Sequence, residues 1–450
     1  MRDTSEIFSS LTKNQKEATA ILSVGTFLEY FDLMLYVHMA VLLNELFFPK
    51  ADLHVASLIA AFAFCSSYVL RPLGALLFGY IGDKVGRKIT VILTTFLMAF
   101  ACFTMAIIPT YAQIGIIATW IVTICRMVQG MASMGEMTGA QLYLTEILRP
   151  PVRYPCVIFM SVTSVLGTVF ALLTASLVTL HDVNWRYAFG MGAIIALVGS
   201  VARTGLRETP DFVDAKRRIK QSVVRSNINP ELLENNKIWQ EKVKIKTILA
   251  LFLLQCAWPV CSYFSYIYCG NILKYTFGFT SAQVIYQNLI ISIAHVSLLL
   301  VLAYCSYKIY PLKIAKILLI PFFIIITIAP YLLKQANSTD TLFIIRLLIV
   351  LFAPASYLVI PISFMHIPVF KRFTYVSLSF AISHSFFYCL TSFGMVYLVE
   401  WFGYWGVTII TVPMAISFLW AIMHFQLLEK EAGNFPQKQE ISHYVVHEVS

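Results

Sequence analysis

The stretch that decides the fold reads Arg71-Pro-Leu-Gly-Ala-Leu-Leu-Phe-Gly-Tyr-Ile-Gly-Asp-Lys-Val-Gly-Arg-Lys88. An apolar run ends at about Tyr80 to Ile81, and the charged segment 82–88 follows. A second apolar run starts at once with Ile89. This order predicts a tight charged turn that joins two membrane helices.

Glycines and charges share this turn. Its glycines, which permit close helix approach and a sharp reversal, are Gly79, Gly82 and Gly86. Asp83 and the pair Arg87 and Lys88 carry opposite charges at a membrane face. An ion pair can form and break there, so we interpret the turn as a latch.

The composition indicates an integral membrane protein. Of 450 residues, 59% are hydrophobic and 12% are charged, and the mean hydropathy is +0.76. A typical soluble chain has about a quarter of its residues charged. The polar segment 1–17 lacks the apolar core and cleavage site of a signal peptide. The nine cysteines lack metal-ligand spacing, so we expect them to be core residues and expect no metal.

We expect an all-α membrane protein with twelve transmembrane helices, since a spanning helix needs about 20 apolar residues. The apolar runs lie near residues 18–43, 55–80, 89–109, 112–137, 156–180, 187–205, 246–270, 283–306, 313–333, 341–365, 374–399 and 403–428. The expected units are a first six-helix bundle, a basic linker, a second bundle and a tail, over 1–205, 206–245, 246–428 and 429–450. Two such halves are typical of transporters built from repeats.

Lysine and arginine placement predicts the orientation. With the N-terminus inside, the outer loops carry only four basic residues, Lys50, Arg186, Lys274 and Lys334. Both termini and the central linker are therefore expected in the cytoplasm. The same bias accounts for the net charge of +10, so we expect no nucleic-acid partner.

The first predicted helix carries two acids. Glu29, Asp32 and Tyr36 follow the spacing i, i+3, i+7, which places them on one helical face. Ionisable groups inside a membrane are costly and usually mark a pathway or a coupling site. Two carboxylates on one buried face do not both stay ionised without a nearby cation, so we expect one of them to exchange a proton.

The fourth predicted helix supplies a cation. Arg126, Gln129 and Glu136 share a broad face, and Arg126 is expected to be the only strong cation embedded in the first half. It is therefore the natural partner of a first-helix carboxylate, or it grips an anionic substrate. An arginine keeps its proton at ordinary pH.

The second half offers weaker candidates, namely His295, Arg346 and His384. A lone histidine in a membrane is more often a hydrogen-bonded packing residue than a proton carrier. Aromatic residues are abundant here, and some can bind a methylated ammonium group through cation–π contact.

Several motifs resemble those of a known family. They are Gly79-x-x-Gly82-Asp83-Lys84-x-Gly86-Arg87-Lys88, Arg126-x-x-Gln129-Gly130, Leu28-Glu29-Tyr30-Phe31-Asp32, Gly135-Glu136, Trp185-Arg186, Leu206-Arg207-Glu208-Thr209-Pro210-Asp211-Phe212 and Arg372-Phe373-Thr374-x-x-Ser377-Leu378. Together they resemble the metabolite:H+ symporter family of the major facilitator superfamily. That family includes proline/betaine, α-ketoglutarate, citrate and shikimate transporters.

The resemblance implies the twelve-helix fold, a bacterial inner-membrane location and proton-coupled uptake by alternating access. It implies that the first-helix acids, Arg126 and Glu136 belong to the cavity and coupling network. It also implies that Asp83 and Arg87 form a cytoplasmic gate that locks the outward-open state. The corresponding loop of the second half, 307–313, has no Asp, so we expect any locking there to be weaker or different.

We therefore expect a proton symporter of a small polar metabolite, with no cofactor beyond the proton, that works as a monomer in the lipid bilayer. Three acids and one cation in the first half favour a zwitterion such as proline or betaine over a di- or tricarboxylate. A non-transporting receptor of the same fold is the alternative of another class. An enzyme is disfavoured because HExxH, GxSxG and Cys/His clusters are missing from the sequence.

Overall fold

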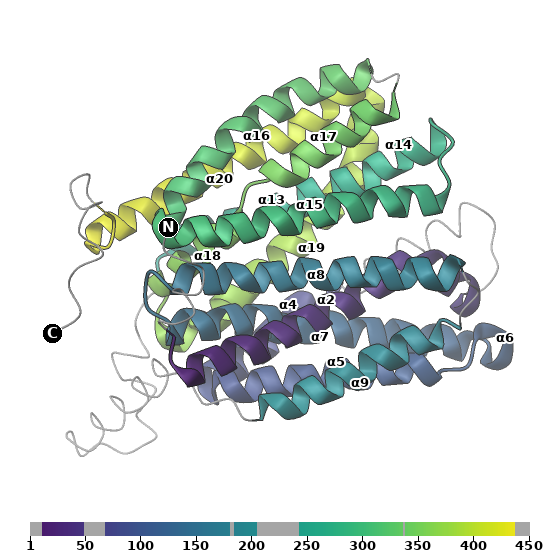
Figure 1. The fold of residues 1–450 in the computed structure, drawn as a ribbon, viewed down its shortest axis with the longest axis horizontal. Helices are drawn as coiled ribbons and strands as arrows, with labels where there is room; N and C mark the ends of the chain where they lie inside the picture. The colour runs from purple at the N-terminus through teal and green to yellow at the C-terminus, as the bar shows by residue number, and fades with distance from the viewer. Residues whose placement is uncertain (1–10, 49–67, 181–183, 205–242, 336–337, 437–450) are drawn as a thin grey trace.

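The computed structural model describes residues 11–48, 68–180, 184–204, 243–335 and 338–436, and every regular element in these ranges is a helix (Figure 1). The elements of the first half are α2 (Lys13–Phe47), α4 (Arg71–Lys84), α5 (Arg87–Ile107), α6 (Tyr111–Ile114), α7 (Ile116–Ile147), α8 (Arg153–Leu180) and α9 (Arg186–Arg203). Those of the second half are α12 (Ile245–Gln255), α13 (Ala257–Ser262), η2 (Tyr263–Tyr268), α14 (Cys269–Tyr275), α15 (Ser281–Lys308), α16 (Pro311–Lys334), α17 (Thr339–Phe352), α18 (Ser356–Ser363), η3 (Phe364–His366), α19 (Val369–Phe402), η4 (Gly403–Trp405) and α20 (Gly406–Glu431).

Ten stretches in the described ranges are long and apolar enough to cross a membrane. The two other predicted spans correspond to α4, whose run begins among undescribed residues, and to α9. Large apolar side chains cover the outside of the bundle, as Phe96, Phe100 and Phe103 do on α5. Nearly all of the predicted linker and most of the predicted tail lie outside the described residues.

Two predicted spans are interrupted. The run over 246–270 contains a π-helix, η2, between α13 and α14. The run over 341–365 breaks between α17 and α18, where Pro354 follows Ala353. A residue before proline is pushed out of the helical region, and Ala353 has ψ of 141°.

The turn of the opening stretch is shorter than predicted. Helix α4 continues through Lys84 and α5 already begins at Arg87, so only Val85 and Gly86 separate them. Gly86 has φ of 143°, a conformation that side-chain-bearing residues rarely adopt. Asp83 and Arg87 therefore stand on helix ends, which restrict their side chains more than a loop would.

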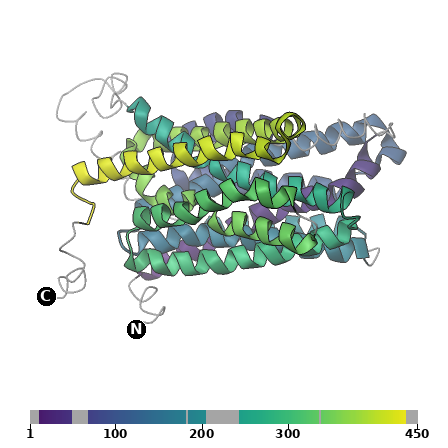
Figure 2. The same ribbon diagram turned by 90° about the horizontal axis from the view of Figure 1, so that it is seen from above.

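The two halves meet along long helices. Helix α8 packs against α15, and α4 packs against α19 (Figure 1). The start of α2 and the end of α20 lie at the same end of the bundle, on the left in both views (Figures 1 and 2). The helices thus place the α4–α5 turn beside the beginning of α19.

Candidate functional site

The α4–α5 turn is bound to the second half through Asp83. Its Oδ1 accepts the backbone N–H of Phe373 at 3.0 Å, and its Oδ2 accepts that of Thr374 at 2.8 Å. Asp83 is buried, with 4% of its side chain exposed. Burial raises the pKa of this carboxyl, and the Arg87 charge and the two amides oppose that rise. Hydrogen bonds from N–H groups to a carboxylate are stronger than neutral ones, so this contact holds the two halves together.

Arg87 completes the contact from the start of α5. It is fully buried and donates to the carbonyls of Gly82 at 2.6 Å and Val369 at 2.7 Å. One of its amino groups lies 3.5 Å from Asp83 Oδ1, so the expected ion pair is present. Lys88, the other predicted cation, is only partly buried.

A residue that the sequence reasoning missed, Glu146, joins the same cluster from the end of α7. Arg87 Nε lies 3.3 Å from Glu146 Oε2, and Arg372 donates to Oε1 at 2.9 Å. We call Asp83, Arg87, Glu146 and Arg372 the latch. Two negative and two positive charges offset one another there, which reduces the cost of burying them.

Two glycines let the latch close. A Cβ on Gly82 would lie 2.5 Å from the Phe373 ring, and one on Gly79 would lie 2.7 Å from the Thr374 Cα. Any side chain would therefore separate α4 from α19. The predicted close approach is present, and its partner is a helix from the other half.

The second half has its own polar cluster at this end. Glu429 on α20 accepts from Tyr310, and its Oε1 lies 2.7 Å from His366 Nε2. Tyr310 packs edge-on against Tyr154 of the first half, with ring centroids 5.9 Å apart. Loop 307–313 has no Asp, and the acid of this cluster comes from another helix, α20.

Inside the first half, a chain of polar contacts links an acid to a cation. Cys102 on α5 donates from Sγ to Asp32 Oδ2 at 2.9 Å and accepts from Gln129 Nε2 at 3.2 Å. Arg126 donates to Gln129 Oε1 at 3.0 Å. Cys102, expected to be only a core residue, therefore connects Asp32 to Gln129, which in turn accepts from Arg126.

The remaining first-half candidates are placed less completely. Glu29 lies on α2 with Asp32 and is 3% exposed. Tyr36 on α2 and Glu136 on α7 belong to described helices, but their side chains lie outside the described part of the chain.

The expectation that Arg126 is the only strong cation embedded in the first half is wrong. Arg71, at the start of α4, is 7% exposed, and its guanidinium lies 4.3 Å from the centroid of the Tyr68 ring. The charge count of the first half therefore includes a second arginine, which the opening stretch itself contains.

The second-half candidates lie in separate surroundings. Arg346 on α17 donates to the Ser265 carbonyl in η2 at 2.7 Å and to Gln287 at 2.8 Å, and it also bonds Asn288 on α15. A π-turn often marks a functional site. Arg346 thus has three hydrogen-bond partners that fix its guanidinium.

Both histidines pack on aromatic rings. His295 stacks on Trp258 at 5.0 Å, and its buried Nδ1 has no hydrogen-bond partner among the described residues. His384 stacks on Phe380 at 3.8 Å, with Nδ1 3.1 Å from the Phe380 carbonyl. For His384 the predicted packing role agrees with its contacts.

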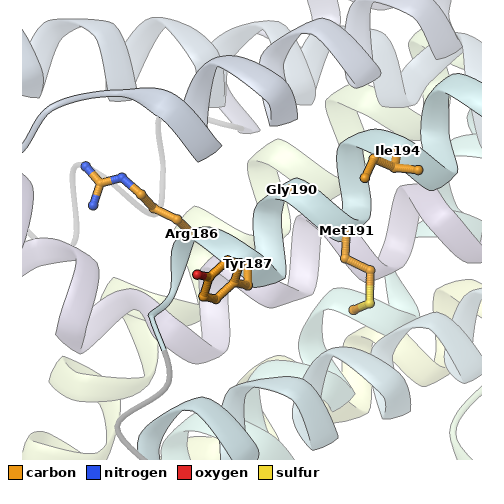
Figure 3. A pocket seen from close by; sticks show the side chains of 5 residues that line it. All are labelled: Arg186, Tyr187, Gly190, Met191 and Ile194. Atoms are coloured by element: carbon orange, nitrogen blue, oxygen red, sulfur yellow. The ribbon is translucent and has the colours of Figure 1, made fainter.

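A hollow on α9 is a surface feature. Arg186, Tyr187, Gly190, Met191 and Ile194 line it (Figure 3). Its walls are nearly all apolar, and its residues follow one face of a helix on the outside of the bundle. Within the described ranges, no group of three or more His, Cys, Asp and Glu residues is arranged to hold a metal ion.

Residues 22–365 match the family model of the Major Facilitator Superfamily. The chain is 31% identical over 213 residues to the proline/betaine transporter of Salmonella typhimurium, which covers 46% of this chain and 43% of the relative. It is 32% identical over 229 residues to the inner membrane metabolite transport protein YhjE of Escherichia coli. This match covers 48% of this chain and 52% of the relative. The matches span about half the length of these curated relatives.

Solved structures share the fold. The proton:xylose symporter XylE bound to 6-bromo-6-deoxy-D-glucose superposes with a TM-score of 0.72 at 16% identity, over 90% of this chain and 95% of that chain. The human organic anion transporter MFSD10 superposes with a TM-score of 0.60 at 14% identity, over 92% of this chain and 100% of that chain. These likenesses concern the arrangement of helices.

Proposed function

Because the chain belongs to the Major Facilitator Superfamily, we propose that it is a secondary transporter that moves a small polar solute inward together with a proton. The membrane is proposed to be the bacterial inner membrane, with both termini in the cytoplasm. The protein is proposed to work as a monomer and to use no cofactor.

The observation that carries proton coupling is the chain Asp32–Cys102–Gln129–Arg126 inside the membrane-spanning helices α2, α5 and α7. A carboxylate and a guanidinium in such a place are costly. Protonation of Asp32 removes its charge and weakens the hydrogen bond that it accepts from Cys102. The contacts that connect Cys102 to Arg126 through Gln129 are then weakened as well. The solute and the proton then affect each other's binding reciprocally.

The latch supports alternating access. In this structure the buried Asp83 and Glu146 hold α4, α5 and α7 against the start of α19. We propose that this is the closed cytoplasmic gate and that its opening releases the solute inside. The exchange of latch contacts for water then accompanies each turnover.

A zwitterion such as proline or betaine is the preferred solute class, and a di- or tricarboxylate is the alternative. Relatives that bear the name proline/betaine transporter favour the first. The retained intramembrane charges disfavour a receptor that does not transport, because such a protein has no need of a costly buried acid.

Purified protein in proteoliposomes tests the proposal. An inward proton gradient is imposed, and uptake of proline, betaine, α-ketoglutarate and citrate is measured beside solute-dependent internal acidification. The expected result is accumulation of at least one solute that collapses when a protonophore is added. Proton symport would be overturned if the internal pH did not change when solute was added and if solute uptake did not depend on the proton gradient.

A further inference from the structure

Arg71 is a buried cation that the coupling chain and the latch do not use. It stands at the first position of α4 and is 7% exposed. Its Nε is buried without a hydrogen-bond partner, and no carboxylate within the described ranges forms an ion pair with it. Burying a charge is costly unless it is paired. A site that retains such a charge is suited to an anionic ligand.

The Arg71 guanidinium lies against an aromatic ring that itself packs on a ring of the second half. It lies over Tyr68, whose ring centroid is 4.7 Å from that of Tyr388 on α19. His384, one turn earlier on α19, stacks on Phe380, and its ring centroid is 6.1 Å from that of Tyr388. The charge and the ring beneath it therefore belong to the first half, and the rings that pack next to that ring belong to the second.

Two further tyrosines, Tyr388 and Tyr30, have polar partners on neighbouring helices. The hydroxyl of Tyr388 lies 3.2 Å from Ser262 Oγ on α13. Tyr30 on α2 donates to Met137 Sδ at 2.8 Å.

The other buried intramembrane arginines are already engaged. Arg126 donates to Gln129 within the coupling chain, and Arg346 is fixed by hydrogen bonds in the second half. Arg71 alone among these three has an aromatic ring and no polar acceptor as its described partner. Its planar fork matches a carboxylate in a bidentate manner.

We propose that Arg71 binds the carboxylate of the transported solute between α4 and α19, beside the rings of Tyr68 and Tyr388. This rests on the proposed function and names its substrate class: solutes that carry a carboxylate. In a zwitterion, the ammonium group faces the tyrosine rings, which can hold it by cation–π contact. Since the carboxylate touches both halves, its binding favours conformations in which α4 and α19 lie close together.

Ligand pairs that differ only around the carboxylate test the proposal. The affinity of the purified full chain in lipid nanodiscs is measured for two pairs of ligands, proline with prolinamide and betaine with choline. Succinate is measured as a further carboxylate probe. Wild type is expected to bind a carboxylate probe and to bind its partner without a carboxylate at least tenfold more weakly. Arg71→Gln is expected to lose about 10- to 100-fold in carboxylate affinity, the range of a lost charged hydrogen bond.

Matched variants separate recognition from folding. Arg186→Gln is the control, because Arg186 also stacks on an aromatic ring, 4.5 Å from Trp185, but lies at the α9 hollow (Figure 3). It is expected to bind every probe as wild type does. If Arg71→Gln fails to fold, Arg71→Lys retains the charge without the fork and is expected to show a smaller loss confined to carboxylate probes.

Contrary outcomes are distinct. Unchanged carboxylate affinity in both Arg71 variants, or equal wild-type affinity for proline and prolinamide, would overturn the inference. Proton-coupled uptake of a solute without an anionic group would overturn it and leave the proposed function standing. Arg71-dependent carboxylate binding without any proton-driven uptake would uphold it and overturn the proposed function.

Discussion

Asp83 and Phe373 are 290 residues apart in sequence, yet the carboxylate of the first accepts the backbone N–H of the second at 3.0 Å. Arg87 donates to the carbonyl of Val369, four residues before Phe373. In an α-helix that carbonyl and that N–H are partners of each other. The latch therefore binds the polar backbone groups of one helical turn of α19 from both sides.

Asp83→Asn is expected to open the gate. The amide keeps an acceptor oxygen but loses the charge, which removes about 1–2 kcal/mol from the closed state. The inward-open population should rise about 5- to 30-fold. Alkylation of cysteines introduced on the cytoplasmic side of the cavity measures it. Asp340→Asn, at the exposed start of α17, is the control, and equal alkylation of both variants would contradict the latch.

Gly82→Ala is expected to force α4 away from α19, because the new methyl group would lie 2.5 Å from the Phe373 ring. Cysteine accessibility should rise as in the Asp83 variant. The double variant with Phe373→Leu should restore part of the closed population. Gly190→Ala, where a Cβ meets nothing within 4 Å, should behave as wild type. A double variant as open as Gly82→Ala alone would show that this ring is not the obstacle.

Glu146→Gln is expected to destabilise the closed state, because Arg372 would lose the carboxylate at 2.9 Å while Arg87 would keep its ion pair with Asp83. Breaking a buried charge cluster costs about 3–5 kcal/mol. The melting temperature in detergent should fall, and gate accessibility should rise. Glu400→Gln, exposed near the far end of α19, should leave both unchanged. An unaltered melting temperature in Glu146→Gln would remove the energetic basis of the four-charge cluster.

Asp32→Asn and Arg126→Ala are expected to abolish proton-driven accumulation while the protein remains folded in the membrane. Each removes one end of the chain that links acid to cation. Solute counterflow, which needs no net proton movement, should persist in Asp32→Asn. Gradient-driven uptake at the wild-type level in both purified variants would exclude this chain from coupling.

Cys102→Ala is expected to reduce proton-driven accumulation several-fold, because it removes the thiol between Asp32 and Gln129. Cys102→Ser should retain most of it, since a hydroxyl also donates and accepts. Cys125→Ala removes another buried thiol of the first half and should leave accumulation unchanged. Equal activities of the Ala and Ser variants at position 102 would argue that the thiol only fills space.

The amino-acid sequence alone was sufficient to predict the membrane class, the helical runs and two of the four latch residues, Asp83 and Arg87. These depend on local quantities, namely apolar run length and the spacing of Asp83, Arg87 and the glycines. The break at Pro354 also has a local cause, although the apolar run by itself predicts one continuous helix. The π-helix η2 could not be predicted from the local sequence, because the backbone hydrogen bonding there depends on the neighbouring helices.

Only the tertiary structure decided which charges meet. Glu146 and Arg372 are 226 residues apart, and Cys102 and Asp32 are 70 apart, so no sequence period relates them. Arg71 is the clearest example. It belongs to the stretch of sequence that identifies the fold, but only the packing of α4 beside α19 shows that it has no carboxylate partner among the described residues. Spacing along a chain determines which side chains share a helix face. Which faces then share a buried site depends on how the two halves pack.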